Sequence, residues 1–294
     1  VIAAGRAKGQ SVAFWLSGCP AGRDLLAQDD YRLGKRVSAE ALNTVIAEGR
    51  DKGQSVAYWL SGFPAGRDLL AQDDYRLGKM VSAEALNTVI TEGPDKGHSV
   101  AFWLSCCSAG RDLLAQDDYR LGKMVSAEAL NTVIAAGRAK GQSVAFWLSG
   151  CPAGRDLLAQ DDYRLGKRVS AEALNTVIAE GRDKGQSVAY WLSGFPAGRD
   201  LLAQDDYRLG KRVSAEALNA VIAEGPGKGQ SVAFWLYCSL TGRDLLAQDD
   251  CRLGKMISAE ALNTVIAEGP NKGHSVALAL SGFPAGQGLL AQDD

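Results

Sequence analysis

The sequence predicts an all-α fold: a solenoid of the right-handed α-α superhelix type, with about seven 44-residue repeats and three short helices in each repeat. Three observations predict it. The phrase VIA(A/E)G, written VITEG once, recurs every 44 residues from Val1 to Val265 without insertion or deletion. Apolar residues within each period follow helical spacing between glycine-containing turns. No segment shows the period-two alternation of half-buried strands.

The repeats follow one another as one array, which we expect to be a single domain over residues 1–294 with incomplete first and last units. Residues 1–44 and 133–176 are identical, which indicates a duplicated block of three repeats. A 44-residue unit is too small to enclose a core, so each repeat must bury its apolar side against its neighbours. The repeats begin at Val1, Val45, Val89, Val133, Val177, Val221 and Val265.

The first helix expected in a repeat begins after Ser38 and ends before Gly49. Serine is a favoured N-cap, and glycine is typical just past the end of a helix. Leu42, Val45 and Ile46 have the i, i+3, i+4 spacing of one apolar face. We therefore expect this face to pack on the rest of the repeat.

Two further helices are expected in each period. Residues 54–61 are apolar nearly all round, which predicts a short central helix that ends at Gly62. Residues 63–78 form the third, with Pro64 in its first turn. Because aspartate is also a favoured N-cap, the DD pair within this stretch leaves two alternatives open, one helix or two.

Composition and charge indicate a folded, soluble chain. Of its 294 residues, 46% are hydrophobic and 22% are charged, with a net charge of −2. That balance gives no overall attraction to nucleic acid or to an anionic membrane. Apolar runs such as SVAFWL are far shorter than the ~20 residues that span a bilayer. We expect a cytoplasmic protein, or one delivered into a host cell, without a signal peptide or transmembrane segment.

The cysteines and histidines show no metal-binding or disulfide pattern. No CxxC pair occurs, and His98 lies 176 residues from His274. Other repeats carry Phe, Gly or Tyr where one repeat has Cys, so we expect free thiols in a reducing compartment, no metal site and no cofactor. The cysteines are Cys19, Cys106, Cys107, Cys151, Cys238 and Cys251.

The adjacent carboxylates of LLAQDDYRLGK, first met as Asp29 and Asp30, raise the question of a catalytic pair. LLAQDD occurs seven times, whereas a catalytic pair is needed once. We expect a structural role, in which Asp29 pairs with Arg32 three residues on, or one aspartate caps a following helix. No residue suited to catalysis stands in a context of its own, so we expect no enzyme and no catalytic residue.

Tryptophan and lysine recur at fixed places in the repeat. A tryptophan such as Trp59 stands in each apolar helix but the last, which predicts an inter-repeat core; a stacking platform is the alternative. The turn GRAKGQS, residues 5–11, lacks the lysine position and preceding strand of a nucleotide-binding P-loop. Lys8 and free amides at the next helix start could still hold an anion.

Differences between copies gather in two turns. One joins the first and second expected helices, and the other joins the second and third. Loops contribute little packing energy, so this variation has two possible origins. Either the loop residues drift neutrally, or the loops form a surface whose residues select a binding partner. The candidate partner-binding residues are Arg50, Asp51, Phe63, Pro94, Asp95, Cys107, Arg182, Asp183, Phe195 and Pro226.

The period and helix content resemble those of armadillo and HEAT arrays, which repeat every ~40–47 residues. The amino-acid sequence of the repeat also resembles that of helical repeat arrays in bacterial secreted effectors. These resemblances imply a non-enzymatic scaffold that binds a protein or peptide through many small contacts along an extended surface. No membrane or small-molecule partner is indicated.

The turn between the first two helices resembles the repeats of TAL-effector DNA-binding proteins. Both have a short helix, a two-residue variable turn, Gly and Lys, and another helix. The resemblance implies the alternative function, a nucleic-acid-binding array with one unit per repeat. The 44-residue period and the near-neutral charge depart from that family's pattern.

Overall fold

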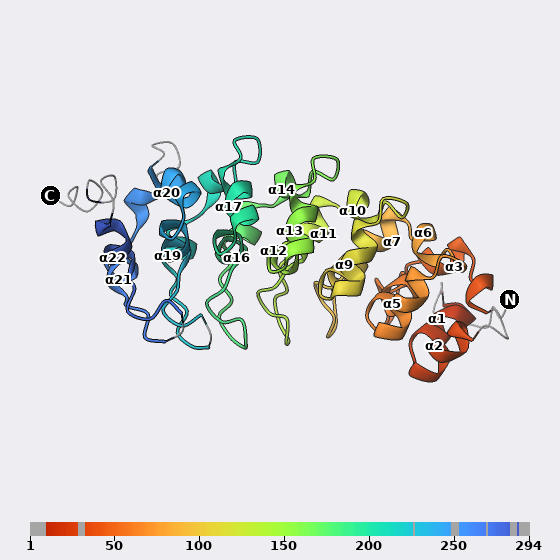
Figure 1. Ribbon diagram of the computed structural model, residues 1–294. Helices are drawn as coiled ribbons and strands as arrows, with labels where there is room; N and C mark the ends of the chain where they lie inside the picture. The colour runs from red at the N-terminus through yellow and green to blue at the C-terminus, as the bar shows by residue number, and fades with distance from the viewer. Residues whose placement is uncertain are drawn as a thin grey trace. The chain divides into compact units, whose positions relative to one another are not determined.

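The 44-residue period appears in the computed structural model as a regular succession of short helices joined by turns (Figure 1). The structure describes residues 10–28, 33–225, 227–247, 253–268, 270–282 and 287. No strand occurs in these ranges, and the predicted all-α helical solenoid is confirmed. The chain divides into two compact units, Val1–Gly137 with Gln160–Leu165 and Arg138–Ala159 with Gly166–Asp294. The expectation of one array stays a prediction.

Among the described residues, the same types of helical segment recur at 44-residue intervals. Six-residue helices form from VAFWLS and its variants: α1 (Val12–Ser17), α4 (Val56–Ser61), α8 (Val100–Ser105), α12 (Val144–Ser149), α16 (Val188–Ser193), α19 (Val232–Tyr237) and α22 (Val276–Ser281). Eight-residue helices form from PAGRDLLA and its variants: α2 (Pro20–Ala27), α5 (Pro64–Ala71), α9 (Ser108–Ala115), α13 (Pro152–Ala159), α17 (Pro196–Ala203) and α20 (Leu240–Ala247).

Two shorter segments complete the repeat. The LGK stretch forms a single turn, either 3-10 or α: η1 (Gly34–Arg36), α6 (Leu77–Met80), α10 (Leu121–Met124), α14 (Leu165–Arg168), η2 (Gly210–Arg212) and η3 (Gly254–Met256). AEALN forms five-residue helices: α3 (Ala39–Asn43), α7 (Ala83–Asn87), α11 (Ala127–Asn131), α15 (Ala171–Asn175), α18 (Ala215–Asn219) and α21 (Ala259–Asn263).

Serine caps start the five-residue helices, as the sequence predicts at Ser38, and they also start the six-residue helices. The Ser55 side chain accepts a hydrogen bond from the Tyr58 amide at 3.1 Å, and the Ser82 side chain accepts one from the Ala85 amide at 3.1 Å. Helices of this length are not stable alone in water, so they depend on packing against their neighbours.

The first expected helix is shorter than the apolar spacing suggests. It ends at Asn43, and the chain continues in extended form from Thr44. The Ile46 amide then donates to the Gln54 carbonyl at 2.9 Å, and the Gly53 amide donates to the Ile46 carbonyl at 2.8 Å. This pairing closes a loop and takes Ile46 off the helix, although its side chain is still buried.

The third expected helix is divided into two, which decides between the alternatives left open by the sequence. The α5 helix ends at Ala71, and the amides of Tyr75 and Arg76 both donate to the Gln72 carbonyl. Arg76 adopts a left-handed backbone conformation with φ of 57°, and α6 begins at the next residue. The turn points Tyr75 into the core.

The paired aspartates lie in this turn and have a structural role. Asp29, Asp30 and Arg32 themselves are outside the described residues. Their equivalents Asp73 and Asp74 follow the end of α5, so neither expected arrangement applies. Both carboxylates are instead within salt-bridge distance of lysines from the LGK segments.

An asparagine joins each repeat to the next within both units. The Asn43 Nδ2 donates to the Met80 carbonyl at 2.7 Å, and its Oδ1 accepts from the Ser82 amide at 2.7 Å. Asn87 makes the same pair of contacts one repeat further on, as does Asn219 in the second unit. Each repeat therefore completes the backbone hydrogen bonding of its neighbour.

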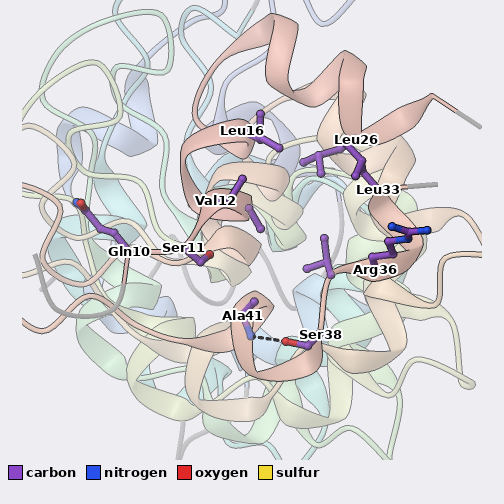
Figure 2. A pocket seen from close by; sticks show the side chains of 11 residues that line it. Gln10, Ser11, Val12, Leu16, Leu26, Leu33, Arg36, Ser38 and Ala41 are labelled. Atoms are coloured by element: carbon purple, nitrogen blue, oxygen red, sulfur yellow. Dashed lines mark hydrogen bonds between the residues drawn. The ribbon is translucent and has the colours of Figure 1, made fainter. Parts of the chain in front are cut away.

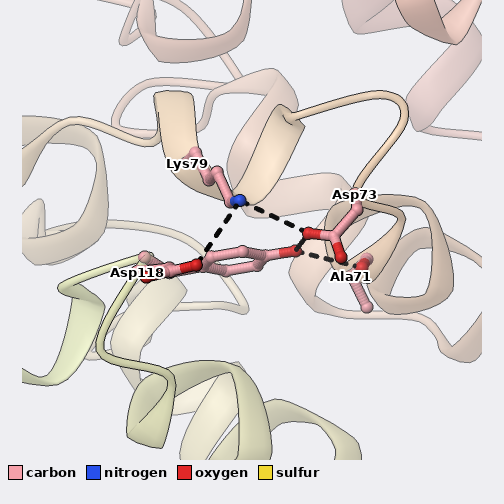
Figure 3. Close-up of polar contacts among 5 residues, drawn as sticks. Ala71, Asp73, Lys79 and Asp118 are labelled. Carbon is pink, nitrogen blue, oxygen red and sulfur yellow. Dashed lines mark hydrogen bonds and ion pairs between the residues drawn. The ribbon is translucent and has the colours of Figure 1, made fainter.

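A buried tyrosine makes a second junction between repeats. The Tyr119 hydroxyl donates to the Ala71 carbonyl at 3.0 Å and to Asp73 Oδ1 at 3.3 Å. Figure 3 shows Lys79 between two carboxylates, 3.4 Å from Asp73 and 3.9 Å from Asp118. We call the turns that carry these residues (72–76, 116–120, 160–164 and 204–208) the tyrosine edge.

Corresponding helices of successive repeats lie side by side within each unit (Figure 1). In the first unit α4 lies between α1 and α8, and in the second α16 lies between α12 and α19. Within each unit, the buried side chains of these helices form a core that continues from repeat to repeat. None of the described helices has the length and apolar character needed to cross a membrane.

Candidate binding edge

The variable turn between the first two expected helices forms a loop with a fixed backbone. Besides the paired hydrogen bonds between Ile46 and Gln54, the Lys52 amide donates to the Gly49 carbonyl at 3.2 Å. Gly49 has a φ of 86°, a conformation that favours glycine, and its described equivalents Gly93, Gly137, Gly181 and Gly225 also have positive φ. We call these loops (47–53, 91–97, 179–185 and their equivalents) the loop edge.

Three of the candidate residues brace the loops instead of facing solvent freely. Asp51 Oδ2 accepts a hydrogen bond from Gln10 Nε2 of the preceding repeat at 2.9 Å, and Asp183 accepts the same bond from Gln142 at 2.9 Å. For Asp95 the donor is Gln54 Nε2, at 3.5 Å. These aspartates are half-buried, and they fix each loop to its neighbour.

Three other candidate residues stand at the exposed loop tips. Arg50, Pro94 and Arg182 are exposed, and each directly precedes a bracing aspartate. Pro226 lies outside the described residues. The structure thus holds the tip position in the same local geometry from repeat to repeat while the residue at the tip changes.

The loop lysines are paired with the next loop. Lys52 Nζ lies 3.0 Å from Glu92 Oε1, and Lys140 Nζ lies 3.2 Å from Glu180 Oε1. Lys8, the candidate anion ligand, is outside the described residues. At these two equivalent positions the cation already has a carboxylate partner, which does not favour a continuous row of phosphate contacts.

Phe63 and Phe195 lie in the second variable turn, half-buried between repeats. The Arg23 guanidinium carbon is 3.7 Å from the centre of the Phe63 ring, and Arg155 is 3.8 Å from that of Phe195. Trp59 stacks on Phe63, with ring centroids 6.2 Å apart. A partner would meet only part of each ring, because an arginine and a tryptophan already contact it.

Cys107 has a capping role in the same turn. Its Sγ accepts a hydrogen bond from the Gly110 amide at 3.4 Å, at the start of α9. Burial raises the pKa of the neighbouring Cys106 thiol, which keeps it protonated and unreactive at neutral pH. The described cysteines are all free thiols.

The candidate residues therefore fall into two groups. The loop edge precedes the six-residue helix of each repeat, and the second variable turn follows it, so ~9 Å of helix separates them. Two of the tryptophans lie between repeats, as predicted: Trp59 packs edge-on against Phe14, and Trp103 against Tyr58, with ring centroids 6.5 and 6.4 Å apart. Trp15, in the first repeat, is exposed.

Sequence reasoning missed the pairing of Lys52 with Glu92 and of Lys140 with Glu180. The signal was available as a lysine followed by a glutamate 40 residues later. In the part of the chain that the structure describes, no group of three His, Cys, Asp or Glu side chains could hold a metal ion. Comparisons with protein-family models, curated proteins and solved structures found no match to this chain.

Proposed function

We propose that the protein is a non-enzymatic scaffold that binds a protein or peptide partner along the loop edge. The observation that carries this proposal is the contrast at neighbouring positions of each loop. The exposed tip varies, as in Arg50, Pro94 and Arg182, while the backbone around it is closed and braced. A surface that is ordered before binding loses little conformational entropy on binding, and contacts from several loops add along one partner.

The charge pattern supports a protein partner over nucleic acid. Loop tips carry both signs, because Glu48, Arg50 and Lys52 alternate within one loop and all are exposed. Phosphate tracking needs unpaired cations in a row, whereas lysines in two loops are paired with glutamates. The proposal includes binding of the armadillo and HEAT kind, which rests on the 44-residue period alone. It also includes delivery into a host cell as a secreted effector, which rests on the amino-acid sequence of the repeat alone.

Selection of displayed random peptides on the immobilised full chain tests the proposal. Peptides that bind are then titrated against the R50A/P94A variant and against D68A/D112A, which removes two exposed aspartates on α5 and α9. We expect the tip variant to lose at least about tenfold in affinity and the control to lose little.

A parallel titration with random-sequence DNA, single- and double-stranded, at several salt concentrations tests the alternative. A steep loss of DNA affinity with salt would indicate phosphate contacts and would favour the nucleic-acid array. Recovery of peptides whose binding ignores the tip substitutions would overturn the proposed site.

A further inference from the structure

The pocket beside α1 carries little charge. Its volume is about 630 Å³, and its apolar lining includes Val12, Leu16 and Leu26 (Figure 2). Among the described residues that line it, Arg36 alone has a charged side chain. An apolar hollow with one cation does not specify the chemistry of a ligand. The loop edge, where charged side chains are numerous, specifies a partner more closely.

Charge is distributed unevenly along the loop edge. In the second unit, residues 138–141 and 179–185 carry four basic and two acidic side chains. The equivalent residues of the first unit, 50–53 and 91–97, carry three of each sign. The difference arises because Ala139 stands at the place of an aspartate and Arg182 at the place of a proline. We call residues 138–141 and 179–185 the basic loop pair.

The two carboxylates of the basic loop pair already have partners. Glu180 Oε1 lies 3.2 Å from Lys140 Nζ, and Asp183 Oδ2 accepts a hydrogen bond from Gln142 Nε2 at 2.9 Å. Arg138 and Arg182 are exposed, and neither makes an ion pair within the part of the chain that the structure describes. Their guanidinium groups are therefore free to bind an anion from outside the chain.

The two arginines occupy equivalent positions in successive repeats. Each directly follows a glycine with positive φ, 82° at Gly137 and 84° at Gly181, so the two loops present them from the same backbone geometry. The helices that follow these loops, α12 and α16, lie side by side. Packed helices lie ~8–10 Å apart, and we expect the same separation between the two arginine backbones.

This spacing matches one conformation of an acidic peptide. Arginine binds a carboxylate through two parallel N–H donors. A polyproline II helix has three residues per turn and rises ~3.1 Å per residue, so side chains three residues apart lie on one face, ~9 Å from each other. In a β-strand, side chains three residues apart point to opposite faces. A polyproline II segment can therefore place one carboxylate on each arginine, and a β-strand with the same spacing cannot.

We infer that the basic loop pair binds an acidic peptide segment in the polyproline II conformation, with a carboxylate at every third residue. The inference rests on the proposed function and names the chemistry of the partner at one part of the loop edge. The exposed Lys184 adds to the attraction for an acidic segment. Glu180 and Asp183 lie in the same loops and would repel a phosphate backbone, which is charged at every nucleotide. A peptide with two uncharged residues between its carboxylates has less negative charge to place near them.

Fluorescence anisotropy of labelled peptides with the full chain tests this inference. One peptide is proline-rich with glutamate at every third position, and a second has the same composition with its glutamates at every second position. The first should bind more tightly. R138A/R182A should weaken its binding at least about fivefold at low ionic strength, and the effect should fade as salt is added.

Two exposed arginines of the tyrosine edge provide the matched control. Arg76 and Arg120 are also one repeat apart, so R76A/R120A removes the same charge from another surface of the chain. This variant should bind the first peptide like the wild type. All four arginines are exposed, and circular dichroism should show that both double variants remain folded.

Reversal of the charges gives the sharper result. R138E/R182E should reject the peptide with glutamate at every third position. It should instead bind the peptide in which lysine replaces each glutamate, because the same spacing then places opposite charges together. A general loss of binding to both peptides would mean that the two arginines do not form the site.

Several results would overturn the inference: no binding of the first glutamate peptide, equal binding of the two spacings, or an equal loss in R76A/R120A. Single-stranded DNA that binds more tightly than the peptide, and that is released by R138A/R182A, would show phosphate recognition instead. Peptides selected from the random library separate this inference from the proposed function. If their binding responds to R50A/P94A and not to R138A/R182A, the inference fails and the proposed function stands. If it responds to neither, both fail.

Discussion

The tyrosine edge and the loop edge both join successive repeats through side-chain hydrogen bonds, but they differ in burial. Tyr119 is 4% exposed and donates to a backbone carbonyl, whereas Asp95 is half-buried and accepts from Gln54 at 3.5 Å. Water can therefore replace the second bond more readily than the first. A side-chain hydrogen bond between repeats therefore cannot be removed without loss of stability where it is buried, but it can be replaced at little cost where solvent reaches it.

The largest difference between the edges should appear at high pH. Burial, with nearby Asp117, raises the pKa of Tyr163 to about 12, and burial and Asp73 also raise the pKa of Tyr119. An unfolded tyrosine titrates near ~10, so the folded state holds these protons more tightly. The stabilisation is complete below pH ~10 and is lost as the pH rises toward about 12.

We therefore expect the array to unfold cooperatively in that alkaline window as its tyrosines ionise. Tyrosinate absorbance and far-ultraviolet circular dichroism, followed together, should change over the same range. Titration of the tyrosines near their ordinary pKa while the helices persist would show that the tyrosine edge is not closed to solvent.

A glycine substitution on each edge should give the next largest difference. A Cβ at Gly78 would lie 2.5 Å from the Leu70 carbonyl oxygen and 2.6 Å from the Tyr119 ring, so G78A should lose about 3 kcal/mol of unfolding free energy. At Gly93, with φ of 80° and nothing within 4 Å, G93A should lose only about 1 kcal/mol from backbone strain.

Urea unfolding of both glycine variants measures this difference. Equal losses would mean that the tyrosine edge relaxes to admit a methyl group, and that the two edges are packed alike.

Removal of a single buried hydroxyl should have a smaller effect. Y119F keeps the ring and deletes the donor to the Ala71 carbonyl, which should lower the free energy of unfolding by about 1 kcal/mol. Thermal unfolding of Y119F beside the wild type checks this value. An unchanged stability would show that solvent already satisfies the Ala71 carbonyl.

Much of the fold could be predicted from the sequence because it depends on local spacing. The serine caps and the burial of Leu42 and Ile46 follow from positions within one repeat. The junctions made by Asn43 and Tyr119 could not be predicted, because they depend on which backbone groups a neighbour 37 to 48 residues away exposes. That a residue is the same in most repeats does not identify it as a junction residue, since the exposed Asp68 recurs as regularly as Asn43 and Tyr119 do.

The candidate site could be predicted only in part, for a related reason. Variation among copies located the loops, and the exposed tips are among the residues it selected. It did not separate Arg50 from its neighbour Asp51, although one faces solvent and the other braces the preceding repeat. A half-exposed brace tolerates replacement, so it varies much as a free surface residue does.

The smallest predicted effect tests that last point. D95A removes the acceptor of a 3.5 Å hydrogen bond from Gln54, and it should change the free energy of unfolding by less than about 0.5 kcal/mol, since water can take the place of the carboxylate. The chain itself carries an alanine at the equivalent position, Ala139. D51A, which breaks a 2.9 Å hydrogen bond, should lose slightly more free energy of unfolding than D95A and still less than Y119F.

The opposite outcome is that D95A lowers stability in urea unfolding as much as Y119F does. The loop edge would then contribute as much stability per hydrogen bond as the tyrosine edge. The residues of the loop edge could not then vary from repeat to repeat without loss of stability, and the loop edge would be unsuited to selecting a binding partner.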